Sequence, residues 1–138
     1  PKSTRALIEK PKFLSHISGY KNLELLASIN NTIGAKEIEQ TLKKVNLYED
    51  RNKVYGKYSL GMKQKLGIAQ VLMENPDIMI FDEPFNGLED ESTKKIRDIL
   101  LSEKKKGKII LIAPHIKEDV EILCDEVYRI DGGKIIES

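Results

Sequence analysis

The stretch YSLGMKQKLGIAQVLMENPDIMIFDEPFNGLE, residues 58–89, decides the fold of this chain. Ser59 belongs to a residue type that caps helix N-termini, and helix-breaking Pro76 follows Glu74 and Asn75. Between them, apolar residues recur at the spacing that buries one face of a helix. They are Met62, Leu66, Ala69 and Met73. Residues 78–81 then form a continuous apolar run, typical of a strand covered on both faces.

Two adjacent carboxylates, Asp82 and Glu83, close the predicted strand. Open α/β sheets bind ligands at the C-terminal ends of their strands, and an unpaired carboxylate is costly in a core. Because neighbours on an extended chain point to opposite faces, one carboxylate can hold a metal while the other polarises a water. A plain acidic turn is the alternative. The helix N-terminus at Ser59, where Gly61 permits close approach, adds a potential anion site and favours the functional interpretation.

Composition excludes several classes of protein. The chain has 138 residues, with 23 basic and 22 acidic ones, and a formal net charge of +1. This balance gives no reason to expect a nucleic-acid partner. Cys124 is the only cysteine, so no internal disulfide can form. No apolar run is long enough to span a membrane and no signal peptide is evident. The first residue is Pro, and we expect the chain to be part of something longer.

Three motifs in the stretch resemble those of the nucleotide-binding domain of ABC transporters. Residues 59–64 resemble the signature motif in a variant of LSGGQ, and residues 78–83 resemble a Walker B strand followed by the catalytic glutamate. Residues 86–89 are similar to the D-loop, with Glu89 where Asp is usual. The resemblance implies an α/β, partial P-loop NTPase (ABC ATPase) fold, in which a mostly parallel sheet core carries an α-helical signature subdomain.

The resemblance also implies a division of the chain. Residues 1–138 would be a partial nucleotide-binding domain. About 15–75 would be the helical subdomain that docks onto a transmembrane subunit, and 1–14 and 76–138 would belong to the α/β core. Apart from the stretch already quoted, hydrophobic patterning predicts an edge strand, four helices, a second buried strand and a closing hairpin. These elements fall at residues 4–8, 19–30, 35–46, 91–106, 116–123, 109–113 and 126–136.

Catalytic and metal-binding roles follow from the resemblance, residue by residue. Glu83 would be the general base that orients the attacking water, and His115 would be the switch histidine at the γ-phosphate. Asp82 would hold Mg²⁺ through water. Glu9 stands at the place of the Q-loop glutamine that reaches the metal, and a carboxylate can also bind a hard cation. Pro114 stands where Ser is common, a mild departure.

The residues implied in nucleotide binding come from the signature motif and the D-loop. They are Ser59, Leu60, Gly61, Gln64, Asn86 and Gly87. In the family, Ser59 and the backbone at Gly61 would bind the γ-phosphate held by the opposite subunit of a head-to-tail dimer with two sandwiched ATP molecules. The cofactors implied are ATP and Mg²⁺. The partners implied are a second nucleotide-binding domain and a transmembrane permease, at the cytoplasmic face of the cell membrane.

The sequence ALIEKPKF, residues 6–13, resembles the corresponding stretch in exporters of antimicrobial peptides such as bacitracin and lantibiotics. We therefore expect an ATPase subunit that exports drugs or antimicrobial peptides. A soluble ABC-type ATPase of translation or DNA repair, and a non-catalytic permease-docking module, are the alternatives. The chain contains no GxxxxGK[ST] pattern. We therefore expect no ATP hydrolysis by this chain alone, and unpaired strand edges at 109–113 and 126–130 that favour self-association.

Overall fold

The computed structural model describes residues 4–7, 12–114 and 117–137. Its helices and strands alternate as an α/β chain, which confirms the predicted fold class. The described elements are β1 (Thr4–Leu7), α1 (Gly19–Asn30), α2 (Ala35–Lys44), α3 (Leu60–Leu72), β2 (Ile78–Asp82), α4 (Asp90–Lys105), β3 (Ile109–Ala113), α5 (Lys117–Leu123), β4 (Arg129–Asp131) and β5 (Lys134–Glu137). Short 3-10 turns at Tyr48–Asp50 and Tyr55–Lys57 connect α2 to α3.

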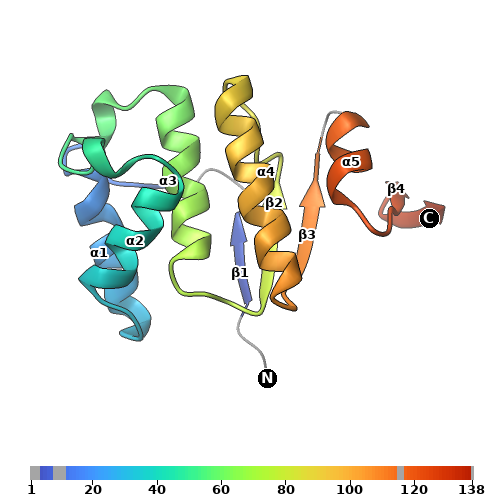
Figure 1. Cartoon of the computed structure of the whole chain (residues 1–138), viewed down its shortest axis with the longest axis horizontal. Coiled ribbons are helices and arrows are strands. Elements are labelled where there is room, and N and C mark those ends of the chain that lie inside the picture. Colours follow the sequence, from blue (N-terminus) through green and yellow to red (C-terminus); the bar gives the residue numbers. More distant parts are fainter. Residues whose placement is uncertain (1–3, 8–11, 115–116, 138) are drawn as a thin grey trace.

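The sheet is parallel, with the strand order β1-β2-β3. β1 lies at one edge, as predicted. In the pairing of β2 with β3, Asp82 lies opposite Ala113. β4 and β5 form a separate antiparallel hairpin, in which Gly132 and Gly133 take positive φ at the turn. Helix α4 lies in front of the sheet, while the helices α1 to α3 gather at one end and the hairpin lies at the other (Figure 1).

The two faces of the sheet differ in burial. Met79 and Phe81 are buried against the helical side, where Ile96 and Leu100 of α4 join the core. On the opposite face Ile109 and Leu111 of β3 are 52% and 56% exposed. The prediction that 109–113 is a buried strand is therefore wrong. β3 lies at the edge of the described sheet, and within the described residues no helix covers its outer face.

The helical end of the molecule forms a second part of the core. Leu23 of α1, Leu42 of α2 and Leu66 of α3 are fully buried within it. Helix α3 contacts α1 and α2 on one side and β1 on another, so both sides of it are covered. The loop before α3 is fixed by Tyr58, whose hydroxyl donates to the Asp50 carbonyl at 2.8 Å. The expected helices are therefore present, although α3 ends at Leu72, before the predicted end.

Candidate functional site

The first turn of α3 opens at an exposed serine cap. Ser59 has extended backbone angles, and its Oγ accepts a hydrogen bond from the Met62 N–H at 3.2 Å. This confirms the predicted N-cap. Leu60, 49% exposed, and the half-buried Gly61 follow in the first turn. The first backbone N–H groups of a helix have no partner within it, so this turn can accept an anion.

The turn packs directly against the loop that follows β2. A Cβ atom added to Gly61 would lie 3.1 Å from the Gly87 carbonyl oxygen. A Cβ added to Gly87 would lie 2.8 Å from Leu60 Cγ, and Gly87 also has a φ of +79°. Glycine at 87 is therefore favoured both by its backbone angle and by this contact, whereas a side chain at 61 would require the Gly87 carbonyl to shift slightly. The structure thus brings together two segments that lie apart in the sequence, 59–61 and 86–87.

Asp82 and Glu83 lie beside this contact, at the C-terminal end of β2. Asp82 is the exposed last residue of the strand. Glu83 is half-buried, and its N–H donates to the Ala113 carbonyl at 2.9 Å. Its φ is +51°, in the left-handed region that side chains with a Cβ rarely adopt. The extended conformation from which the divergence of the two carboxylates was predicted therefore ends at Asp82 and does not include Glu83.

Gln64 connects helix α3 to the loop that follows β2. Its side chain is buried, and its amide Nε2 donates to the carbonyl oxygens of Glu83 at 3.2 Å and Pro84 at 3.0 Å. Both hydrogens of that amide are therefore used within the chain. The predicted role of Gln64 in nucleotide binding stays a prediction, and within the chain its amide is committed to the loop after β2.

Two predicted site residues, Glu9 and His115, lie outside the described residues. The end of β3 nevertheless reaches the same edge of the sheet, since Ala113 pairs with Asp82. Within the described part of the chain, no group of three or more His, Cys, Asp or Glu side chains is arranged to hold a metal ion. A cation at Asp82 would therefore need ligands other than the described side chains, and Mg²⁺ usually takes water and substrate phosphates as such ligands.

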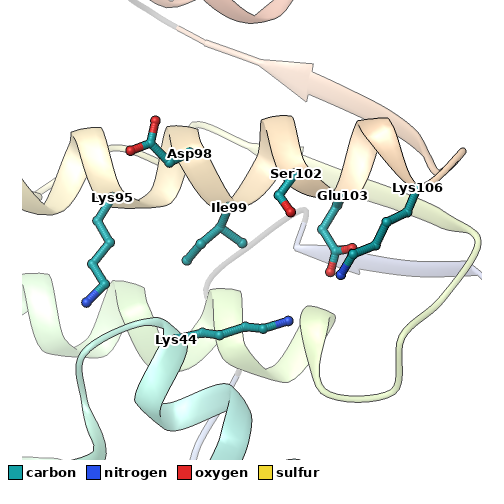
Figure 2. A pocket seen from close by; sticks show the side chains of 7 residues that line it. All are labelled: Lys44, Lys95, Asp98, Ile99, Ser102, Glu103 and Lys106. Atoms are coloured by element: carbon teal, nitrogen blue, oxygen red, sulfur yellow. The ribbon is translucent and has the colours of Figure 1, made fainter.

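A cavity of about 240 Å³ lies elsewhere, between α2 and α4 (Figure 2). Its lining includes none of the predicted site residues. It consists of Lys44, Lys95, Asp98, Ile99, Ser102, Glu103 and Lys106. Glu103 is 3% exposed, and its carboxylate lies 3.4 Å from the Lys106 ammonium. This pair lies within one helical turn and joins a buried carboxylate to an exposed ammonium. The candidate site is instead the C-terminal end of β2, at Asp82 and Glu83.

The chain matches a known protein family. The family described as "ABC transporter" matches residues 1–86. Across the described ranges 4–7, 12–114 and 117–137, none of the helices is long and apolar enough to cross a membrane.

Curated relatives match nearly the whole chain. The uncharacterized ABC transporter ATP-binding protein YybJ of Bacillus subtilis is 37% identical over 135 residues, which is 98% of this chain and 62% of that protein. The bacitracin transport ATP-binding protein BcrA of Enterococcus faecalis is 36% identical, over 96% of this chain and 43% of its own length. The lantibiotic transport ATP-binding protein SrtF of Streptococcus pyogenes is 38% identical, over 95% of this chain and 57% of its own length. The chain thus spans about half the length of these relatives.

A solved structure shares the fold. It is the ADP conformation of MJ1267, described as an ATP-binding cassette of an ABC transporter. The TM-score is 0.76 at 21% sequence identity, and the match covers 97% of this chain and 59% of the other. This likeness confirms the predicted fold.

Proposed function

Since this chain belongs to the ABC transporter family, we propose that it forms part of a subunit that binds and hydrolyses ATP to drive an exporter. The observation that carries this proposal is the meeting of three segments at one edge of the sheet. The Ser59-capped turn packs on Gly87, and the strand ending in Asp82 and Glu83 is tied to the same helix. The anion-binding turn suits the terminal phosphate of a nucleotide held by a second domain, and the two carboxylates suit the metal and the attacking water at this chain's own nucleotide.

Hydrolysis of a terminal phosphate depends mainly on positioning and charge stabilisation. We assign Glu83 as the general base that orients the attacking water. Asp82 would hold Mg²⁺ through water, and the ion would supply charge that neutralises the phosphoryl oxygens. Ser59 and the backbone of Leu60 and Gly61 bind the γ-phosphate.

The remaining assignments come from the family resemblance. Asn86 and Gly87 line the nucleotide, His115 contacts the γ-phosphate, and Glu9 reaches the metal. Ser59 and its turn complete the nucleotide site of a second nucleotide-binding domain in a head-to-tail dimer.

We further propose that residues 15–75 form the helical subdomain that docks onto a permease at the cytoplasmic face of the membrane. Leu25 and Ile29 support this proposal, because they lie one turn apart on α1 and are 46% and 75% exposed. The names of BcrA and SrtF, which specify bacitracin and lantibiotic transport, favour export of antimicrobial peptides or drugs. They also favour a transporter over a soluble ATPase of translation or repair.

The test uses the whole protein that carries this chain, because the chain covers only part of its relatives. ATP turnover is compared between wild type, Glu83→Gln and Glu91→Gln, which alters an exposed acid in the first turn of α4. We expect turnover to fall about a hundredfold or more in Glu83→Gln, with ATP binding retained, and to stay unchanged in Glu91→Gln. Undiminished turnover in Glu83→Gln would contradict the proposal.

A further inference from the structure

We propose that Gln64 is a positioning residue that holds Glu83 in its left-handed backbone conformation. The catalytic meaning of this role depends on the function proposed for Glu83. The positioning itself depends only on contacts within the chain, so the two can be tested separately.

The peptide groups on both sides of Glu83 are fixed by different elements. Its N–H donates to the Ala113 carbonyl of β3 at 2.9 Å. Its carbonyl oxygen accepts from the Gln64 amide at 3.2 Å and from the Asn86 N–H at 3.2 Å. The same Gln64 amide donates to the next carbonyl, that of Pro84, at 3.0 Å. One buried side chain thus orients two consecutive peptide groups.

Such support is needed because the conformation of Glu83 is unfavourable by itself. A φ of +51° brings the Cβ of an L-residue too close to its own backbone, and non-glycine residues remain there only when their surroundings over-determine them. If the backbone of Glu83 relaxed toward an extended conformation, its carboxylate would point in a different direction. The direction in which the carboxylate points is therefore set by the carbonyl contacts of Gln64.

The link also joins the two halves of the candidate site. Gln64 and the Ser59-capped turn belong to the same short helix, α3. A displacement of that turn is therefore transmitted to the peptide groups of Glu83 through a rigid element and two hydrogen bonds. Gln70, on the same helix, provides a contrast. Its side chain is half-buried, and its Oε1 atom has no hydrogen-bond partner among the described residues.

The first experiment measures amide hydrogen exchange by NMR in the 138-residue chain. It compares wild type with Gln64→Leu, which removes the donor at similar volume, and with Gln70→Leu as the matched control. We expect the amides of Glu83 and Asn86 to exchange roughly tenfold faster in Gln64→Leu and unchanged in Gln70→Leu. The amide of Leu66 serves as the reference for an intact helix.

Exchange at Glu83 and Asn86 that is equal in the two variants would overturn the positioning role. Gln64→Met, which keeps the length and an unbranched side chain, replaces Gln64→Leu if the leucine variant does not fold. The same acceleration is expected in it.

The second experiment measures ATP turnover of Gln64→Leu in the whole protein. Because the Gln64 amide is used by the Glu83 and Pro84 carbonyls, we expect kcat to fall about ten- to a hundredfold while KM for ATP stays within about twofold of wild type. A raised KM with unchanged kcat would instead indicate a nucleotide-binding residue and overturn the inference. If turnover survives in Glu83→Gln, the proposed function fails, while the exchange experiment still decides whether Gln64 holds the turn.

Discussion

The contact between Leu60 and Gly87 can be tested by replacing that glycine with alanine. Two separate costs are expected. The φ of +79° strains any residue with a Cβ by about 1–2 kcal/mol, partly offset by the lower entropy of the unfolded alanine chain, about 0.4–1 kcal/mol. In addition, the new Cβ would lie 2.8 Å from Leu60 Cγ and 2.9 Å from its Cδ2. Overpacking of this kind costs about 1–3 kcal/mol, and the lower half applies because Leu60 is 49% exposed.

Gly107→Ala isolates the backbone cost. Gly107 has a φ of +88°, and a Cβ there would meet no atom of the described residues within 4 Å. Its alanine variant should therefore lose about 1 kcal/mol, from strain alone. Gly87→Ala should lose about 1–2 kcal/mol more than Gly107→Ala, because only Gly87 faces a side chain.

The assay is equilibrium urea denaturation of the 138-residue chain, followed by circular dichroism. A third variant completes the cycle. In Leu60→Ala the clashing atoms are gone, and the remaining Cβ of residue 60 lies 3.8 Å away, an ordinary contact. In that background the cost of Gly87→Ala should fall to that of Gly107→Ala. Equal losses for Gly87→Ala and Gly107→Ala in the wild-type background would refute the packing of the α3 turn on this loop.

Three further predictions concern the free energy of unfolding, measured in urea. Glu83→Gly should be more stable than Glu83→Ala by about 1 kcal/mol, because glycine tolerates φ +51°; the reverse order would argue against the left-handed turn. Burial raises the pKa of Tyr58 to about 12, so stability is full below pH 10 and should fall by about 2 kcal/mol as pH rises to 12. Tyr58→Phe should flatten this decline. An equally steep decline in that variant would show that ionisation of Tyr58 is not its cause. Arg97→Met should cost about 3 kcal/mol, since it strands the buried Asp119 carboxylate 2.9 Å away, whereas Lys104→Met, which breaks an exposed pair, should cost less than 1 kcal/mol.

Local signals in the sequence were sufficient for much of the site. Ser59 is a helix cap in the structure because capping depends on the residue and its immediate neighbours. Asp82 ends a parallel strand because the apolar run before it is short and continuous. The signature and loop segments meet where two glycines allow it, at Gly61 and Gly87.

The features that the sequence did not predict depend on tertiary contacts. The predicted helix stripe accounted for one covered face of α3, but Gln64, Ile68 and Val71 form a second buried row at helical spacing. That row was a usable signal that Gln64 points inward. The left-handed φ of Glu83 had no such signal, since it arises from contacts with α3 and β3. Likewise, the apolar pattern of residues 109–113 predicts burial, but burial also requires a covering element.

The central claim is that Asp82 and Glu83 of one subunit, together with the Ser59-capped turn of the opposite subunit, surround the terminal phosphate of a nucleotide and its metal. The most direct measurement replaces Mg²⁺ with paramagnetic Mn²⁺ in the ATP-bound whole protein and records the broadening of amide NMR signals. We predict selective broadening at Asp82, Glu83 and Gly61, abolished by Asp82→Asn, with the Glu103 amide at the distant cavity unaffected. Broadening centred on the cavity, or broadening at Asp82 that persists in Asp82→Asn, would contradict the claim.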